Sequence, residues 1–320
     1  MALKMKINDS INVSWRRVLY WCAVAFAVLL SSASASESVG SGDWSDVDWS
    51  NGEPTALMGA FIRQETQVVT VRKQGQVAHR LVVGQHASHS TLNITSGSLD
   101  LGSAGSEELK GHLYVAWSGV GEVTGIINLR GGALTANWYD TMTNSAGDVA
   151  QLNISGNGTF NLNGNLNVGG GHADAEDRVS ITGSRASIEV SNSVLFEANS
   201  TLKFTLDMYG VSTLNANSFS ADPAAKLVID FGTYVYSGSG TDVVRLVDAN
   251  IFATPFDTAN ISYLNATELS YKLTQDPEGS GDIYVSIPEP SSNAWLGGLA
   301  VWVCGMRTRL AMRRSRSVSI

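Results

Sequence analysis

The chain has 320 residues, of which 43% are hydrophobic and 16% charged, with 32 glycines and only 6 prolines. Residues 36–287 carry 27 acidic and 12 basic residues, a net charge of about −15, which disfavours nucleic acid and anionic lipid as partners. The two cysteines, Cys22 and Cys304, lie outside this body, which excludes a disulfide framework or a thiolate metal site within it.

The first 35 residues have the three-part pattern of a cleavable secretory signal. Residues 18–30 form an apolar stretch, and Ala33 and Ala35 mark a small-residue cleavage site. The 13 apolar residues are fewer than the roughly 17 to 25 that a spanning helix needs. We therefore predict cleavage after Ala35 and export. The positive charges that precede the apolar stretch are Lys4, Lys6, Arg16 and Arg17.

Residues 36–80 are predicted to form an N-terminal cap and the first coils of a repetitive β structure. Trp44 and Trp49 are followed by Gly52, Pro54 and two short apolar runs. Because the open end of a stack of coils must be shielded from water, we expect the two tryptophans to cover the first coil.

Residues 81–190 contain short strands of related sequence, each with alternating apolar and polar residues and most ending at glycine. Four anchors, Leu92, Ile127, Leu152 and Val179, are separated by 35, 25 and 27 residues. Stacked structural repeats have periods of about 20 to 45 residues, so we predict one coil per period. The residues expected to point inward in stacked columns are Leu92, Ile94, Leu152, Ile154, Val179 and Ile181.

These features predict an all-β chain folded as a right-handed parallel β-helix, with glycines at corners where the backbone turns tightly. A β-sandwich of antiparallel hairpins is the competing prediction, since Asn157-Gly158 and Asn163-Gly164 fit hairpin turns. In residues 191–287 the repeat fades into longer apolar strands near 201–206, 226–231 and 243–247. Either wider final coils or a small β-sandwich fits this region.

One compact group of residues is a candidate catalytic site. Asp174, Glu176, Asp177 and Arg178 follow three glycines, and polysaccharide lyases or hydrolases need carboxylates and a base on one face. A solvated insertion between coils explains these residues equally well. We therefore expect no catalytic residues and no enzyme activity, with a polysaccharide lyase or hydrolase as the alternative.

Metal sites have little support. His86 and His89 offer two ligands where catalytic zinc takes three, and His79, His112 and His172 are scattered. Asp43, Asp46 and Asp48 interleave with Trp44 but lack the EF-hand spacing. We expect neither a cofactor nor a metal, and Ca²⁺ has no specific support.

Residues 288–320 are predicted to form a sorting tail. Pro288, Glu289 and Pro290 precede a short apolar segment and then a basic cluster, which stays cytoplasmic by the positive-inside rule. The membrane segment is defined by Ala294, Trp295, Leu296, Leu299, Val301, Trp302, Val303 and Met306. The basic cluster consists of Arg307, Arg309, Arg313, Arg314 and Arg316.

This order of Pro-Glu-Pro, apolar segment and arginines resembles the PEP-CTERM sorting signal. The resemblance implies an exosortase-like processing enzyme as partner, transient insertion in the inner membrane, and delivery to the surface or extracellular matrix of a Gram-negative-type bacterium. The body resembles autotransporter-like β-helix repeats in the Trp44/Trp49 opening and the Leu-x-Val-Gly strand at 81–84. We thus expect an exported structural protein of the cell surface or biofilm matrix that associates with extracellular polysaccharide.

Overall fold

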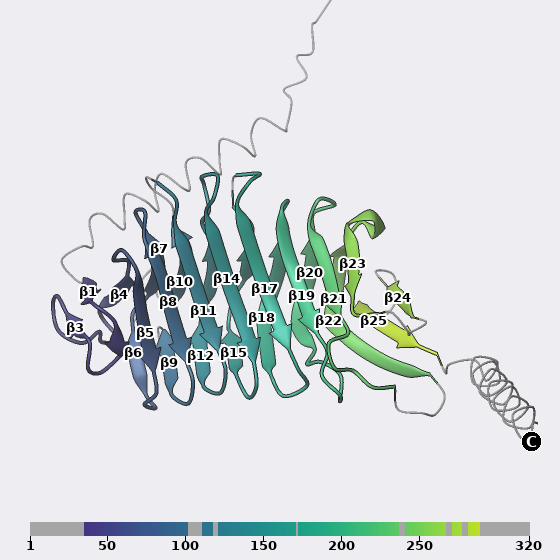
Figure 1. The fold of residues 1–320 in the computed structure, drawn as a ribbon, viewed down its shortest axis with the longest axis horizontal. Coiled ribbons are helices and arrows are strands. Elements are labelled where there is room, and N and C mark those ends of the chain that lie inside the picture. Colours follow the sequence, from purple (N-terminus) through teal and green to yellow (C-terminus); the bar gives the residue numbers. More distant parts are fainter. Residues whose placement is uncertain are drawn as a thin grey trace, which may run out of the picture.

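The computed structural model describes residues 35–101, 111–117, 121–170, 172–236, 241–266, 271–276 and 281–288. Two long β-sheets wind around a common axis as a solenoid of about seven turns, with the coils stacked from the N-terminal to the C-terminal end (Figure 1). Neighbouring coils pair in parallel, which confirms the predicted parallel β-helix and excludes a sandwich of antiparallel hairpins.

One side of the solenoid is a nine-stranded sheet that gains one strand per coil. All its strand pairs are parallel. In spatial order it consists of β2 (Gly42–Asp43), β5 (Gln67–Val71), β8 (His89–Ile94), β11 (Thr124–Leu129), β14 (Val149–Ser155), β17 (Glu176–Thr182), β19 (Ser200–Thr205), β21 (Lys226–Asp230) and β23 (Ile261–Leu264).

The remaining strands form a sixteen-stranded sheet with two branches. One branch runs through β3 (Asp48–Trp49), β1 (Ala35–Val39), β4 (Gly59–Ile62), β7 (Leu81–Gln85), β10 (His112–Trp117), β13 (Trp138–Thr141) and β16 (Leu166–Val168). The other contains β6 (Gln76–Ala78), β9 (Ser98–Leu101), β12 (Ala133–Ala136) and β15 (Thr159–Leu162). Both join β18 (Ser187–Phe196), from which β20 (Leu214–Ala221), β22 (Asp242–Thr254), β25 (Asp282–Ile287) and β24 (Lys272–Gln275) continue.

The predicted anchors stack directly on one another. Leu92 pairs with Ile127, Ile127 with Leu152, and Leu152 with Val179, and all four are fully buried. Strand alternation places the next inward residue two positions later. The six residues predicted to point inward are all buried, so the columns are as expected.

The interior changes shape at β18. The first part of β18, Ser187–Val190, pairs with β15, and its last part, Val194–Phe196, pairs with β16. One long strand therefore replaces two short ones, and the coils lose a corner. Strands β19, β21 and β23 continue the nine-stranded sheet in parallel, so the solenoid extends beyond residue 190.

The two ends differ from the middle. Antiparallel pairs are recorded only for β1–β3, β22–β25 and β24–β25 among the described strands. At the N-terminal end Trp44 is buried, its ring centroid lies 4.8 Å from that of Trp49, and Trp49 Nε1 donates to the Trp44 carbonyl at 2.8 Å. The predicted tryptophan pair is present and packs against the core at this end.

Candidate functional site

The candidate carboxylates at 174–177 do not converge. On β17 the side chains of Glu176 and Arg178 point outward and form an ion pair at 2.7 Å. Asp177 between them points inward, as strand alternation requires, and is buried. Asp174 is exposed in the loop before β17. The structure therefore does not bring these residues into one groove.

Asp177 instead links two coils by hydrogen bonds in the interior of the solenoid. Its Oδ2 accepts hydrogen bonds from Thr143 Oγ1 at 2.6 Å and from the Gly170 amide at 3.0 Å. Burial raises the pKa of this carboxyl, although the hydrogen bonds oppose the rise. Among the described residues, no hydrogen-bond partner is found for its other oxygen or for the hydroxyl of Tyr139.

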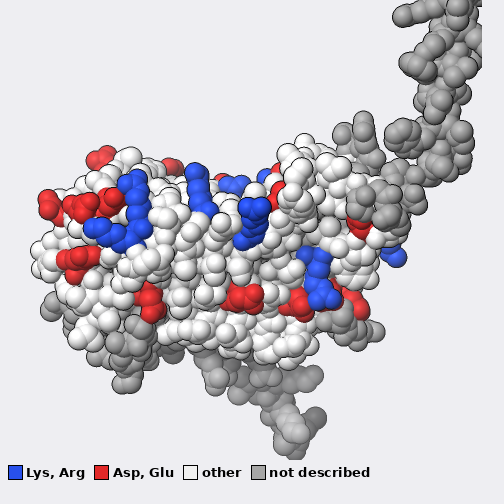
Figure 2. Space-filling view, turned by 90° about the horizontal axis from the view of Figure 1, so that it is seen from below, with Lys and Arg blue, Asp and Glu red and all other residues white. Residues whose placement is uncertain are grey.

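The predicted histidine and aspartate candidates do not gather in one place. His89 Nδ1 lies 3.0 Å from Thr124 Oγ1, whereas Asp43 and Asp46 form ion pairs with Arg72 and Lys73 at 3.0 and 3.7 Å. Figure 2 shows acidic and basic side chains close together at the N-terminal end of the molecule. Within the described ranges, no group of three or more His, Cys, Asp and Glu side chains could hold a metal ion.

A second apolar cluster, absent from the sequence predictions, lies on the outward side of the β4–β7–β10 branch. It consists of Phe61, Val82, Tyr114, Trp117 and Met142, all buried. Strands β7 and β10 are buried at every position, and their mostly apolar sequences are the signal that could have predicted this cluster. Strands buried on both faces have continuous apolar sequences, whereas the sequence analysis named inward residues only on strands with alternating apolar and polar residues.

Asp140 continues this outward row, because it pairs with Tyr114 in register. Burial raises the pKa of its carboxyl to about 6, the hydrogen bond from Asn167 at 2.7 Å opposes the rise, and Glu197 adds to it. The native state therefore binds more protons than the unfolded chain between about pH 4 and 6. Folding stability should fall as the pH rises through this window.

We expect Asp140→Asn to remove about 3 kcal/mol of this pH dependence, since each pKa unit corresponds to about 1.4 kcal/mol. Asparagine keeps an oxygen for Asn167 but cannot ionise, so the variant should be the more stable protein at pH 7 and nearly equal to wild type at pH 4. Urea unfolding at both pH values measures this. Asp48→Asn, a charge change at an exposed position, is the control. An unchanged pH profile would contradict the assignment.

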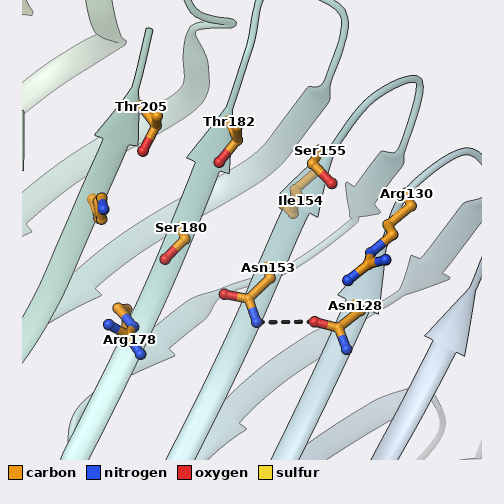
Figure 3. A pocket seen from close by; sticks show the side chains of 10 residues that line it. Asn128, Arg130, Asn153, Ile154, Ser155, Arg178, Ser180, Thr182 and Thr205 are labelled. Carbon is orange, nitrogen blue, oxygen red and sulfur yellow. Dashed lines mark hydrogen bonds between the residues drawn. The ribbon is translucent and has the colours of Figure 1, made fainter. Parts of the chain in front are cut away.

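A polar hollow of about 320 Å³ lies on the outward face of the nine-stranded sheet, across β11, β14, β17 and β19 (Figure 3). Asn128, Asn153 and Ser180 lie side by side on three successive strands. Asn153 Nδ2 donates to Asn128 Oδ1 at 3.0 Å. The lining residues are Asn128, Arg130, Asn153, Ile154, Ser155, Arg178, Ser180, Thr182, Lys203 and Thr205.

The three cations of the hollow differ in their partners. Arg178 is paired with Glu176 at 2.7 Å, and Lys203 with Asp230 at 3.1 Å. Arg130 is exposed, and no side-chain partner is recorded for it in the described part of the chain. The hollow therefore presents one uncompensated guanidinium among hydroxyl and amide groups. The sequence does not reveal this site directly, because its residues come from four strands whose paired positions are 23 to 27 residues apart.

The sorting residues fall mostly outside the described ranges. Ala35 begins β1 and pairs with Gly59, and Pro288 is exposed just after β25. Ala33, Glu289, Pro290, the membrane segment and the arginine cluster lie outside them. None of the described segments is a helix long and apolar enough to cross a membrane.

Comparison of the chain with family models, with curated proteins and with solved structures finds no match.

Proposed function

We propose that this chain is an exported, non-enzymatic scaffold protein of the bacterial surface or extracellular matrix, which associates with polysaccharide. The observation that supports it best is the polar face of the nine-stranded sheet. Asparagine, serine and threonine side chains recur there at the same register in successive coils, on a rigid backbone ladder. Such a face can form many repeated hydrogen bonds to one long hydroxyl-rich polymer.

The architecture suits a structural role. Each coil contacts mainly its neighbours, so stability accumulates along the axis and the body forms a stiff rod. The separation of Glu176 and Arg178 from Asp177 onto opposite faces of β17 favours this role over a polysaccharide lyase or hydrolase.

We further propose that an exosortase-like enzyme processes the tail. Proline has a fixed φ and no N–H, so Pro288 and Pro290 keep the spacer outside the apolar helix. The 13 apolar residues at 294–306 reach only about 20 Å as a helix, which suits a temporary anchor in the inner membrane. The arginines hold the end in the cytoplasm.

Replacing the five tail arginines with serine should leave the protein unprocessed or misplaced in a host that makes such an enzyme. Intact-mass analysis of protein from the membrane, the cell surface and the medium measures this. Replacing the same arginines with lysine preserves the charge and should preserve sorting. Mature surface protein that still carries residues 294–320 would overturn the processing proposal, as would unchanged surface delivery after their deletion.

A further inference from the structure

We propose that the hollow across β11, β14, β17 and β19 binds an acidic polysaccharide that lies along the solenoid axis, with a sugar carboxylate held by Arg130. The inference rests on the proposed function, because it names the class of polymer and the surface that takes it.

The lining is arranged as two parallel rows that cross the strands. Asn128, Asn153 and Ser180 form one row, while Arg130 begins a second row that continues through Ser155 and Thr182. Within a row the step is one strand, about 4.8 Å. This step is comparable with the length of one pyranose unit, so an extended glycan laid across the strands meets a polar side chain at each sugar.

The hydrogen-bonding capacity of the hollow is largely unused. No protein partner is recorded for the hydroxyls of Ser155, Ser180, Thr182 and Thr205 among the described residues, whereas the asparagines already bond to one another. These hydroxyls can donate to and accept from sugar hydroxyls. They provide a uniform polar surface, and Arg130 provides the point of charge.

Arg130 determines the class of ligand. A guanidinium forms two parallel hydrogen bonds to a carboxylate, and charge-assisted bonds of this kind are about twice as strong as neutral ones. Arg178 and Lys203 already have carboxylate partners, so Arg130 is the cation of the hollow that is left for a ligand.

Other polymers fit less well. The residues that line the hollow include no aromatic side chain, and base stacking on aromatics is the main source of affinity for single-stranded nucleic acid. The net charge of about −15 on residues 36–287 also opposes a dense polyanion such as DNA. An acidic glycan with hydroxyl groups between its charges matches both rows.

The test is binding of oligogalacturonate hexamers to the full chain, purified after export, by calorimetry. The matched probe is the same hexamer with its carboxyl groups reduced to alcohols. We expect Arg130→Gln to weaken binding of the acidic hexamer about tenfold and to leave binding of the reduced hexamer unchanged. Lys226→Gln is the control, since it removes an exposed charge of the same sheet outside the hollow. It should change the dissociation constant less than twofold.

Thr182→Val removes a hydroxyl at constant shape and should weaken binding of both hexamers. Equal binding of the acidic hexamer by wild type and Arg130→Gln would overturn the site, and so would preferential binding of a single-stranded DNA oligomer that depends on Arg130. The scaffold proposal would survive both results if the hexamer still binds elsewhere. Conversely, retained tail residues at the cell surface would contradict the processing proposal while leaving the hollow's affinity unaffected.

Discussion

Replacement of Ile154 with aspartate is expected to cost about 4 kcal/mol or more of folding stability, enough to unfold the central coils. Ile154 is fully buried, with Leu129 and Ile181 directly above and below it in the same column. An aspartate there would place a carboxylate among apolar side chains with no cation or donor facing it. Circular dichroism during urea unfolding should show a lower midpoint.

The control is Ser155→Asp, one residue further along the same strand. Ser155 points outward beside Arg130, so an added carboxylate there meets water and a cation rather than the core. It should change stability by less than about 0.5 kcal/mol. A loss of less than 1 kcal/mol in Ile154→Asp would contradict the stacked-column interior.

The sequence alone was sufficient for the interior of the nine-stranded sheet. Leu92, Ile127, Leu152 and Val179 sit at one register because alternation with period two and a corner glycine leave few ways to align successive coils. The same column continues through Leu202 and Leu227, where the repeat in sequence had faded. The buried positions of these later coils are still apolar, whereas the residues around them no longer match the earlier repeats.

Two other features of the fold, a strand and an inward-pointing carboxylate, were not predicted from the sequence. Strand β13 was missed because its sequence, Trp138–Thr141, does not resemble its neighbours, although Tyr139 occupies the same inward position as Leu113 and Leu166. The inward direction of Asp177 was also missed, since a charged residue is ordinarily assigned to the surface. Its neighbours Thr143 and Gly170 come from other parts of the coil, and only the folded chain reveals them as partners.

The polar hollow is the feature that was hardest to predict from the sequence. In the sequence, Arg130, Ser155 and Thr182 each resemble an ordinary solvated residue of a strand. They form a candidate binding surface only because the fold places them next to one another. Aligning the repeats on their inward anchors would have placed all three in one row. An alignment contains no side-chain conformations. It could therefore not show that the other two cations of the hollow form ion pairs, whereas Arg130 has no such partner among the described residues.

Gly84→Ala is expected to destabilise the chain by about 3 to 5 kcal/mol, which combines backbone strain with overpacking. Gly84 has φ +81°, and a Cβ there would lie 2.7 Å from the Thr124 carbonyl oxygen and 2.9 Å from Gly125 Cα. These are backbone atoms of β11, so they cannot move aside as a flexible side chain could. In the next coil the equivalent residue is Ala116, with φ 53°, so the backbone conformation alone is accessible to alanine.

Gly75→Ala separates the two contributions. Gly75 has φ +77°, nearly the same as Gly84, but a Cβ there meets no atom within 4 Å. This variant should therefore pay only the conformational cost, roughly 1 to 2 kcal/mol. Urea unfolding of the two variants side by side measures the difference. Because the two glycines have nearly the same φ, a larger loss at Gly84 reports the contact with β11. Equal losses would show that β7 and β11 do not approach each other as closely as the coil requires.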